Sequence, residues 1–292
     1  MAEDRDFEQN TYAAVYQLIE WKRYKEALEQ TEQLLRHNPE DTDALALIAQ
    51  IYLLMEDYEK SLYWSGEVLK RDPDHTDAWY VRVVTYYDMD DVNAFLEAAY
   101  EALRIEPYRA HYYYLLASQM NKMGKLKQAK EYLLQALQLN ADSPLYLAVL
   151  SYTEALLGHF EESEQLDKQA IQIEAEDPGV LLHLAWAAGH RGDYTLQEKY
   201  MQSAVRLNPE DKQYQDEYLN ALQNSHKLYR IFLAPMKVIR RMKRWQILVS
   251  WLVAVFFFKP LLILFIVLYI LAHWVTKGIV HVRVFGWRRR GS

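Results

Sequence analysis

Histidines and carboxylates most often bind metals or transfer protons in enzymes, and this chain has nine histidines and 40 Asp and Glu residues. His183 and His190 lie seven residues apart on one predicted helix. The other histidines are scattered, and no His-Glu-x-x-His motif occurs. We therefore interpret His183 and His190 as structural or exposed residues, and the sequence predicts no metal site.

Nucleophile and phosphate-loop motifs are missing as well. The chain has no cysteine, no Gly-rich phosphate loop and no Gly-x-Ser-x-Gly motif. Paired carboxylates such as Asp90-Asp91 and Glu161-Glu162 lie where solvated helix ends and turns are expected. Lys259 has the best claim of all ionisable residues to a function, because it lies within the most apolar part of the chain, but membrane anchoring explains it equally well. The sequence predicts neither an enzyme nor a bound cofactor.

Charge divides the chain into two parts that the net charge of −7 conceals. Residues 1–226 carry 20 Lys and Arg against 40 Asp and Glu, whereas residues 227–292 carry 13 Lys and Arg and no acidic residue. An acidic domain before a basic, apolar tail is typical of a protein attached to anionic lipids. Nucleic-acid binding does not fit, because an apolar run follows the basic cluster and the preceding domain is acidic.

A step of 34 residues organises the acidic part. Pro39, Pro73 and Pro107 follow this step, which continues through Ala141 and Ala175 to Pro209, so six units run from about residue 8 to residue 211 without an insertion. A small or medium residue recurs at Val15, Ala49, Val83, Ala117, Ser151 and Ala185. A mostly bulky residue recurs at Tyr24, Tyr58, Val92, Leu126, Phe160 and Tyr194, and a later small or apolar one at Leu34, Val68, Ala102, Ala136, Ala170 and Ala204.

This pattern resembles the tetratricopeptide repeat (TPR) family over about 70% of the chain. Phe95 and Gln197 depart from it, because both occupy a position that is usually small. Each unit contains two amphipathic stretches, and glycines in the triplets 123–125, 157–159 and 191–193 can end the first helix of a pair. We interpret the Arg-Gly-Asp triplet 191–193 as such a turn rather than as an adhesion motif. The predicted fold is all-α: six helical hairpins stacked in a right-handed superhelix, a capping helix over 212–226 with a polar outer face, and a C-terminal membrane helix or helical hairpin.

In TPR domains the first helix of each hairpin lines a concave groove, and the resemblance places seven aromatic residues there. They are Tyr12, Tyr16, Tyr80, Tyr87, Tyr114, Tyr152 and Trp186. Asp43, Asp77 and Asp88 fall on the same face, so we expect the groove to bind an extended or helical peptide with apolar anchors and some positive charge. Alternatively, part of these tyrosines pack between adjacent units. Chaperone-binding TPR domains hold a terminal carboxylate with Lys and Asn, but this chain has Tyr12, Tyr16, Ala46 and Gln50 at those positions, so that clamp is absent.

Three segments follow the predicted TPR domain of residues 1–226. Residues 227–245 form a basic amphipathic juxtamembrane segment, residues 246–276 a membrane-inserted segment broken at Lys259-Pro260, and residues 277–292 a basic C-terminal tail, which is an interfacial strand or an irregular tail. The apolar run 247–275 would measure about 44 Å as one helix, more than the roughly 30 Å hydrocarbon layer requires. The residues expected to contact lipid are Arg240, Arg241, Lys243, Arg244, Trp245, Lys259, Pro260, Trp274 and Lys277.

The distribution of positive residues favours a hairpin that enters and leaves the membrane on one face. Seven Lys and Arg precede the apolar run and five follow it, and such residues are retained on the cytosolic side. A single tilted span remains the alternative, because proline kinks are tolerated in spanning helices. The paired basic flanks favour a bacterial inner membrane with the TPR domain in the cytosol, which the absence of cysteine also fits.

The sequence therefore predicts a membrane-anchored TPR scaffold or assembly factor that binds a protein or peptide partner in its groove and anionic lipids through its tail. The alternative is an integral subunit of a transport, secretion or lipid-modifying complex, in which the C-terminal hairpin contacts the complex and the repeats regulate it. Self-association through exposed repeat ends is a third possibility.

Overall fold

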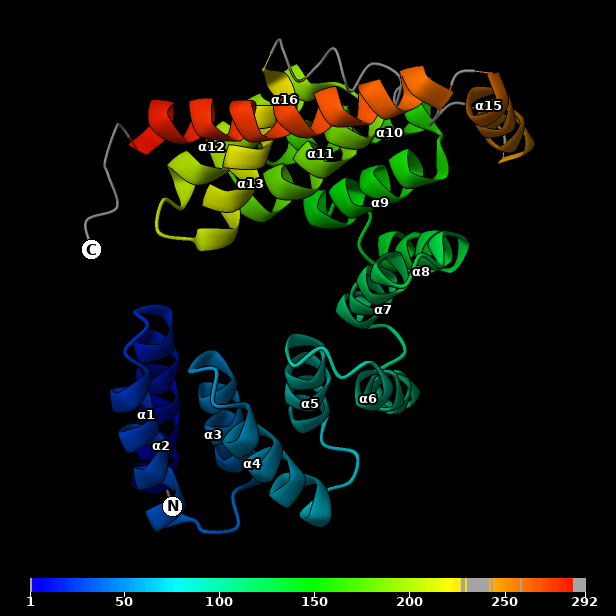
Figure 1. Cartoon of the computed structure of the whole chain (residues 1–292). Coiled ribbons are helices and arrows are strands. Elements are labelled where there is room, and N and C mark those ends of the chain that lie inside the picture. Colours follow the sequence, from blue (N-terminus) through cyan, green and yellow to red (C-terminus); the bar gives the residue numbers. More distant parts are fainter. Residues whose placement is uncertain (1, 227–228, 230–241, 243, 258, 286–292) are drawn as a thin grey trace. The chain divides into compact units, whose positions relative to one another are not determined.

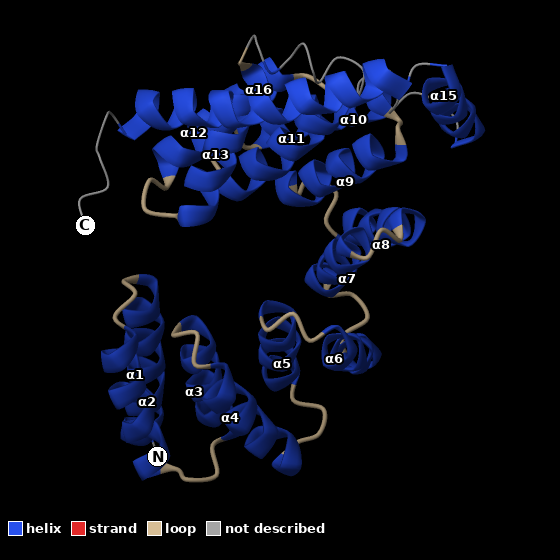
Figure 2. Cartoon of the chain, in the orientation of Figure 1, coloured by secondary structure: helices blue, strands red, loops and turns tan. Residues whose placement is uncertain are grey.

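The computed structural model describes residues 2–226, 229, 242, 244–257 and 259–285, and every regular element in that part is an α-helix (Figures 1 and 2). The chain forms two compact units, Met1–Met123 and Gly124–Ser292. The helices of the first unit are α1 (Ala2–Glu20), α2 (Tyr24–His37), α3 (Thr42–Leu54), α4 (Tyr58–Arg71), α5 (Thr76–Asp88), α6 (Val92–Ile105) and α7 (Ala110–Lys122). Those of the second unit are α8 (Leu126–Leu139), α9 (Pro144–Leu157), α10 (Phe160–Ile173), α11 (Pro178–Arg191), α12 (Tyr194–Leu207), α13 (Lys212–Ser225), α15 (Arg244–Phe257) and α16 (Lys259–Phe285).

The helix boundaries follow the 34-residue step of the sequence. The second helix of every pair has 14 residues and begins at the position where the sequence predicts a mostly bulky residue. Side-chain caps start many of the helices: Asp57, Asp91 and Asp193 each accept a hydrogen bond from a backbone N–H in the first turn. The predicted all-α fold, with six consecutive helical pairs and a capping helix, is confirmed.

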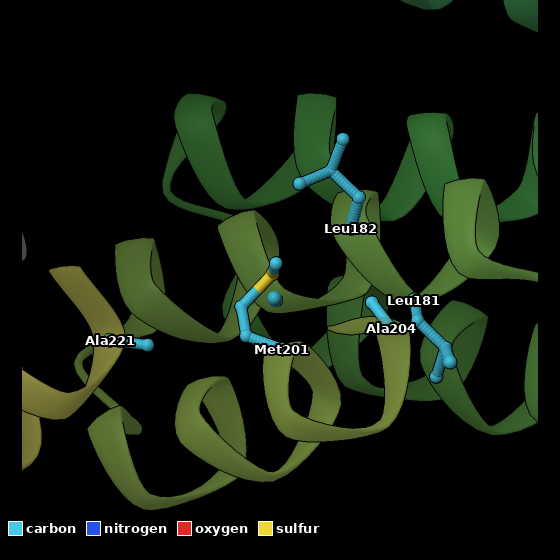
Figure 3. Close-up of a cluster of buried hydrophobic side chains, with 6 residues drawn as sticks. Leu181, Leu182, Met201, Ala204 and Ala221 are labelled. Carbon is cyan, nitrogen blue, oxygen red and sulfur yellow. The ribbon is translucent and has the colours of Figure 1, made fainter. Parts of the chain in front are cut away.

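The repeated small residues explain how closely the helices pack. All six residues at the first small position, from Val15 to Ala185, are fully buried, and those at the later position, from Leu34 to Ala204, are at most 1% exposed. Figure 3 shows the core at the end of the repeats, where Leu181 and Leu182 of α11 lie near Met201 of α12 and Ala221 of α13. Ridges of neighbouring helices can interlock only where such short side chains let the backbones approach.

The two departures from the repeat pattern are accommodated in different ways. Phe95 is 1% exposed and packs edge-on against Tyr87, with ring centroids 5.4 Å apart. Gln197 is 7% exposed and lies against Gly189, where an added Cβ would approach the Gln197 amide to 2.9 Å. The position that holds a small side chain has therefore moved from α12 to α11 in this pair.

The turn inside each helical pair places one residue in the left-handed region. These residues are Lys22, Glu56, Asp90, Gly124, Gly158 and Gly192, again 34 residues apart, with φ between 56° and 86°. The predicted turn at the Arg-Gly-Asp triplet is confirmed, because Gly192 ends α11 in this conformation and Asp193 caps α12. A residue with a Cβ is strained here by about 1 kcal/mol, so the three units with Lys, Glu or Asp are less well suited to the turn.

Replacing Glu56 with glycine is therefore expected to stabilise the first unit by about 1 kcal/mol. Urea unfolding followed by circular dichroism measures the change. Glu56→Ala is the matched control, because it removes the carboxylate but keeps the Cβ and the strain. An equal gain in both variants would show that charge rather than backbone conformation is responsible.

The end of the repeats is covered by a C-terminal helix. α13 contacts α12 on one side and α16 on the other, and Figure 1 shows α16 running alongside α13. The expected polar outer face of the capping helix is therefore partly covered by this chain itself. The predicted break at Lys259-Pro260 coincides with the start of α16, where proline in the first helical turn loses no hydrogen bond. An interfacial strand after residue 277 is wrong, because α16 continues to Phe285.

Candidate functional site

A pocket in the first unit brings together two predicted groove tyrosines and two predicted groove aspartates. We call it the acidic pocket; its volume is about 370 Å³. It is lined by Tyr12, Tyr16, Asp43, Ala46, Leu47, Gln50 and Asp77, which lie on α1, α3 and α5. The first helices of three successive pairs thus supply its walls. The four positions at which the TPR resemblance would place a carboxylate clamp, Tyr12, Tyr16, Ala46 and Gln50, all line it with uncharged side chains.

Hydrogen bonds and exposure fix the character of the acidic pocket. The Tyr12 hydroxyl donates to Asp41 Oδ2 at 3.0 Å, and His75 Nε2 lies 3.1 Å from Asp43 Oδ1. Tyr16 is 51% exposed, so its ring is available to a ligand. Burial, with Asp77 and Asp43 nearby, raises the pKa of Tyr16, which keeps its hydroxyl protonated. The pocket therefore offers carboxylates and aromatic faces, which suit a cation.

A second aromatic group in the first unit is built around Arg109. Its guanidinium lies over the Tyr80 ring at 4.4 Å from the centroid and donates to Glu106 Oε2 at 2.8 Å. His111 packs 5.7 Å from Tyr80 and 5.4 Å from Tyr114. Burial lowers the pKa of His111, and Arg109 acts in the same direction. The structure therefore brings Tyr80 and Tyr114 together through His111. Neither His111 nor Arg109 was predicted from the sequence.

Tyr87 lies in a different setting from the other groove tyrosines. Its ring packs against Phe95, and the Lys122 ammonium lies 4.4 Å from its centroid. Lys122 also donates to Asp90 Oδ1 at 3.3 Å. Asp88 is exposed at the end of α5 and is not among the residues that line the acidic pocket.

The predicted groove residues of the second unit, Tyr152 and Trp186, form an aromatic group with His183 and His190. Tyr152 and Trp186 lie 5.6 Å apart, and Tyr152 lies 5.7 Å from His190. His183 packs edge-on against Trp186 and donates through Nδ1 to the Gly179 carbonyl at 2.8 Å. Burial lowers the pKa of His183. Among the described residues, no group of three or more His, Asp or Glu side chains is arranged to hold a metal ion.

A buried ionic network in the second unit was not predicted from the sequence. Arg191 is 5% exposed and donates hydrogen bonds to Asp167, which is 4% exposed, and to Ser163. Ser151 donates to Asp167 and lies 2.9 Å from Ser163 Oγ. Burial raises the pKa of the Asp167 carboxyl, and Arg191 opposes this shift. Because Arg191 of the Arg-Gly-Asp triplet is buried, it is not available to an external receptor.

The residues predicted to contact lipid are described only in part. Trp245 is 63% exposed and Trp274 is 67% exposed, and the Lys277 ammonium lies 6.0 Å from the Trp274 ring centroid. Arg240, Arg241 and Lys243 lie outside the described residues, as do the side chains of Arg244, Lys259 and Pro260. In the described part, one helix is long and apolar enough to cross a membrane, over Ile263–Val280, and this window is mostly exposed.

Sequence models of known families match the repeats. A model described as anaphase-promoting complex, cyclosome, subunit 3 matches residues 20–97, and one described as tetratricopeptide repeat matches residues 110–143. No curated protein sequence matches the chain significantly.

Solved structures of other proteins align with this chain at low sequence identity. PilF from Pseudomonas aeruginosa is 18% identical with a TM-score of 0.59, and the match covers 73% of this chain and 96% of PilF. MamA from Desulfovibrio magneticus RS-1 is 18% identical with a TM-score of 0.49, covering 58% of this chain and 96% of MamA. YrrB, described as a TPR protein with an unusual peptide-binding site, is 16% identical with a TM-score of 0.46. The match covers 64% of this chain and 96% of YrrB. The likeness to PilF concerns the fold alone.

Proposed function

This chain is a tetratricopeptide-repeat protein, and from that premise we propose that it is a non-catalytic, membrane-attached scaffold that binds a cationic segment of a partner protein in its acidic pocket. The proposed location is the cytosolic face of a membrane, with a bacterial inner membrane favoured by the basic residues on both flanks of the apolar run. Repeat proteins of this kind use extended concave surfaces for binding.

The acidic pocket is the observation that carries the proposal. Asp43 and Asp77 place two carboxylates around exposed aromatic surface, and none of the described residues that line the pocket is Lys or Arg. A lysine or arginine side chain would gain charge-assisted hydrogen bonds from the carboxylates and a cation–π contact from Tyr16. Ala46 and Leu47 add apolar wall for the stem of such a side chain or for a neighbouring apolar residue.

Selectivity follows from the same residues. A terminal carboxylate, the ligand of chaperone-binding TPR domains, would be repelled by Asp43 and Asp77. The two aromatic groups around Tyr80 and around Trp186 offer further anchors within their own units. Anchoring to a bilayer would raise the effective concentration of the scaffold for a partner that is itself at the membrane.

Labelled peptides test the binding. The full chain in detergent or in liposomes is titrated with short peptides that share their apolar positions and carry increasing numbers of lysines, and fluorescence anisotropy reports binding. Affinity is expected to rise with each lysine and to fall when the lysines are acetylated, because acetylation removes the charge. A photo-cross-linking residue at position 16 should capture the peptide, whereas one at Tyr100, which is equally exposed on α6, should not. Preference for acidic peptides would refute the proposal.

The membrane subunit alternative makes a different prediction. The exposed apolar face of α16 would then be covered by another membrane protein rather than by lipid. Purified chain alone would not float with protein-free liposomes of anionic lipid, whereas the scaffold proposal expects that it does.

A further inference from the structure

The side of α16 that faces the repeats is a single stripe in the C-terminal two thirds of the apolar window Ile263–Val280. Its inward positions include Tyr269, His273, Thr276 and Val280, spaced four, three and four residues apart, as one face of a helix requires. Thr276 is fully buried and Val280 is 6% exposed. The rest of the window is largely exposed, so α16 is docked along one side only.

Polar contacts hold this stripe against the repeats. Gln223 Nε2 of α13 lies 3.0 Å from His273 Nδ1 and donates to the His273 carbonyl at 3.2 Å. The Tyr229 hydroxyl lies 3.0 Å from the Tyr269 hydroxyl and 3.3 Å from His273 Nδ1, and the Tyr229 and Tyr269 rings are stacked at 5.8 Å. Every polar side chain of the stripe thus has a partner inside this chain, including Thr276, which donates to the Ala272 carbonyl.

These contacts argue against α16 as a membrane crossing. A cavity of about 290 Å³ is lined by Asp216, Leu219, Asn220 and Gln223 of α13 together with Lys277 and Val280 of α16. Asp216 and Asn220 are exposed, so this end of α13 requires water rather than hydrocarbon. If α13 stays in water, then residues 277–280 of α16 are at the same depth and also lie outside the hydrocarbon.

Length leads to the same result. If the whole docked stretch 269–280 stays beside the repeats and outside the hydrocarbon, about 18 Å of α16 is not available for a crossing. Residues 259–268 provide only about 15 Å, half of what a crossing of the hydrocarbon layer needs. An undocked, spanning α16 would instead carry His273 near the middle of its window, separated from Gln223 and Tyr229. An ionisable side chain at that depth is expensive unless it is paired.

A lipid surface suits the opposite flank of the docked helix. Large apolar side chains on this flank are 44–67% exposed: Ile263, Leu264, Leu271, Trp274, Val275 and Val282. Trp274 and the adjacent Lys277 are the residue types that lie at the headgroup level of a bilayer. Residues 227–292 carry 13 positive charges and no negative ones, which complements anionic lipid.

We propose that α16 stays docked on α13 in the membrane-bound protein and attaches it to one face of an anionic bilayer without crossing it. The inference rests on the proposed attachment to a membrane. Lipid covers the exposed flank of α16, while the Tyr269–Val280 stripe remains on the repeats. The carboxyl end of α16 then lies on the same side of the membrane as the TPR domain.

The absence of cysteine in the chain allows a direct test with single cysteines. Lys277→Cys is suitable, because Lys277 is exposed and lines the cavity beside α13 rather than the flank that lipid would cover. The full chain is added to the outside of sealed liposomes of anionic lipid, isolated by flotation and treated with a membrane-impermeant maleimide. Lys168→Cys, on the exposed face of α10, defines complete labelling. We expect Lys277→Cys to react to the same extent as Lys168→Cys without detergent, whereas protection until detergent is added would overturn the inference.

Cross-linking tests the docking itself in the same liposomes. Asn220→Cys with Lys277→Cys places two thiols on the lining of one cavity, so a short bis-maleimide is expected to join them. Asn220→Cys with Ile263→Cys is the control, because position 263 is about 21 Å further along the helix axis. Failure of the first pair to react in floated protein overturns the docked arrangement. Failure of the chain to float overturns the membrane attachment and the inference together, so the two failures are distinguishable.

Discussion

Replacing Asp167 with asparagine is expected to destabilise the second unit by about 3–5 kcal/mol, because it leaves the Arg191 guanidinium buried without a counter-ion. Arginine cannot lose its proton at accessible pH values. The asparagine side chain would keep the shape of the site and could still accept a hydrogen bond, so the effect isolates the charge. Ser151 and Ser163 are fully buried and uncharged, and they cannot replace the carboxylate.

Urea unfolding of the full chain in detergent measures this loss, and hydrogen exchange locates it in α10 and α11. Glu164→Gln is the matched control: it removes one carboxylate from the exposed face of the same helix and should change the free energy of unfolding little. The double variant Asp167→Leu with Arg191→Met should be less destabilised than Asp167→Asn, because no buried charge remains. If the losses in unfolding free energy caused by Asp167→Leu alone and by Arg191→Met alone add up to the loss in the double variant, the two side chains are not a coupled ion pair.

The sequence contained only part of the signal for this network. The repeat pattern predicts that Ser151 is a small residue at a position where helices approach closely, and it lies there in the structure, against Ser163. Ser151 is the only hydroxyl among the six residues of its repeat position. Arg191, which completes the network, lies at the end of α11, and no local pattern links a turn residue to a buried carboxylate in the preceding helix.

The fold was predictable because its information is local and repeated. Pro39, Pro73 and Pro107 set a period, and each period contains its own helix starts, small contacts and turn. The left-handed turn residues Lys22, Glu56 and Asp90 could not be recognised by type, since only the later units have glycine there. The docking of α16 on α13 was also not predictable, because His273 was visible only as an interruption of an apolar run.

The candidate site was predictable where the TPR repeat pattern determines which face of a helix a residue occupies. The repeat pattern places four residues on one face, and all four line one pocket: Tyr12, Tyr16, Asp43 and Asp77. The repeat pattern does not show which side chains on that face contact each other. Arg109 precedes α7 and reaches back over Tyr80, and that contact depends on the path of the loop before the helix.

Neutralising both aspartates of the acidic pocket, with Asp43→Asn and Asp77→Asn together, is expected to weaken binding of lysine-containing peptides by about 100-fold. Each carboxylate is expected to contribute a charge-assisted hydrogen bond, about 1.5 kcal/mol at the lower end of the measured range, and about 1.4 kcal/mol corresponds to a tenfold change in affinity. Asparagine retains an acceptor for His75 at position 43, so the local structure is conserved while the charge is removed. The affinity of acetylated peptides should be unchanged, because they lack the charge that the aspartates recognise.

A control for general electrostatic attraction decides what this loss means. Glu32→Gln with Glu59→Gln removes the same charge from exposed positions on α2 and α4, the second helices of their pairs, away from the pocket lining. If attraction by the net acidic domain were sufficient, both double variants would weaken binding equally, and added salt would abolish the difference between lysine and acetyl-lysine peptides. A loss confined to the pocket variant and largely retained at high salt identifies a desolvated contact, because partly buried charge pairs are screened much less than exposed ones. Equal loss in the two double variants would leave the acidic pocket without a specific role in recognition.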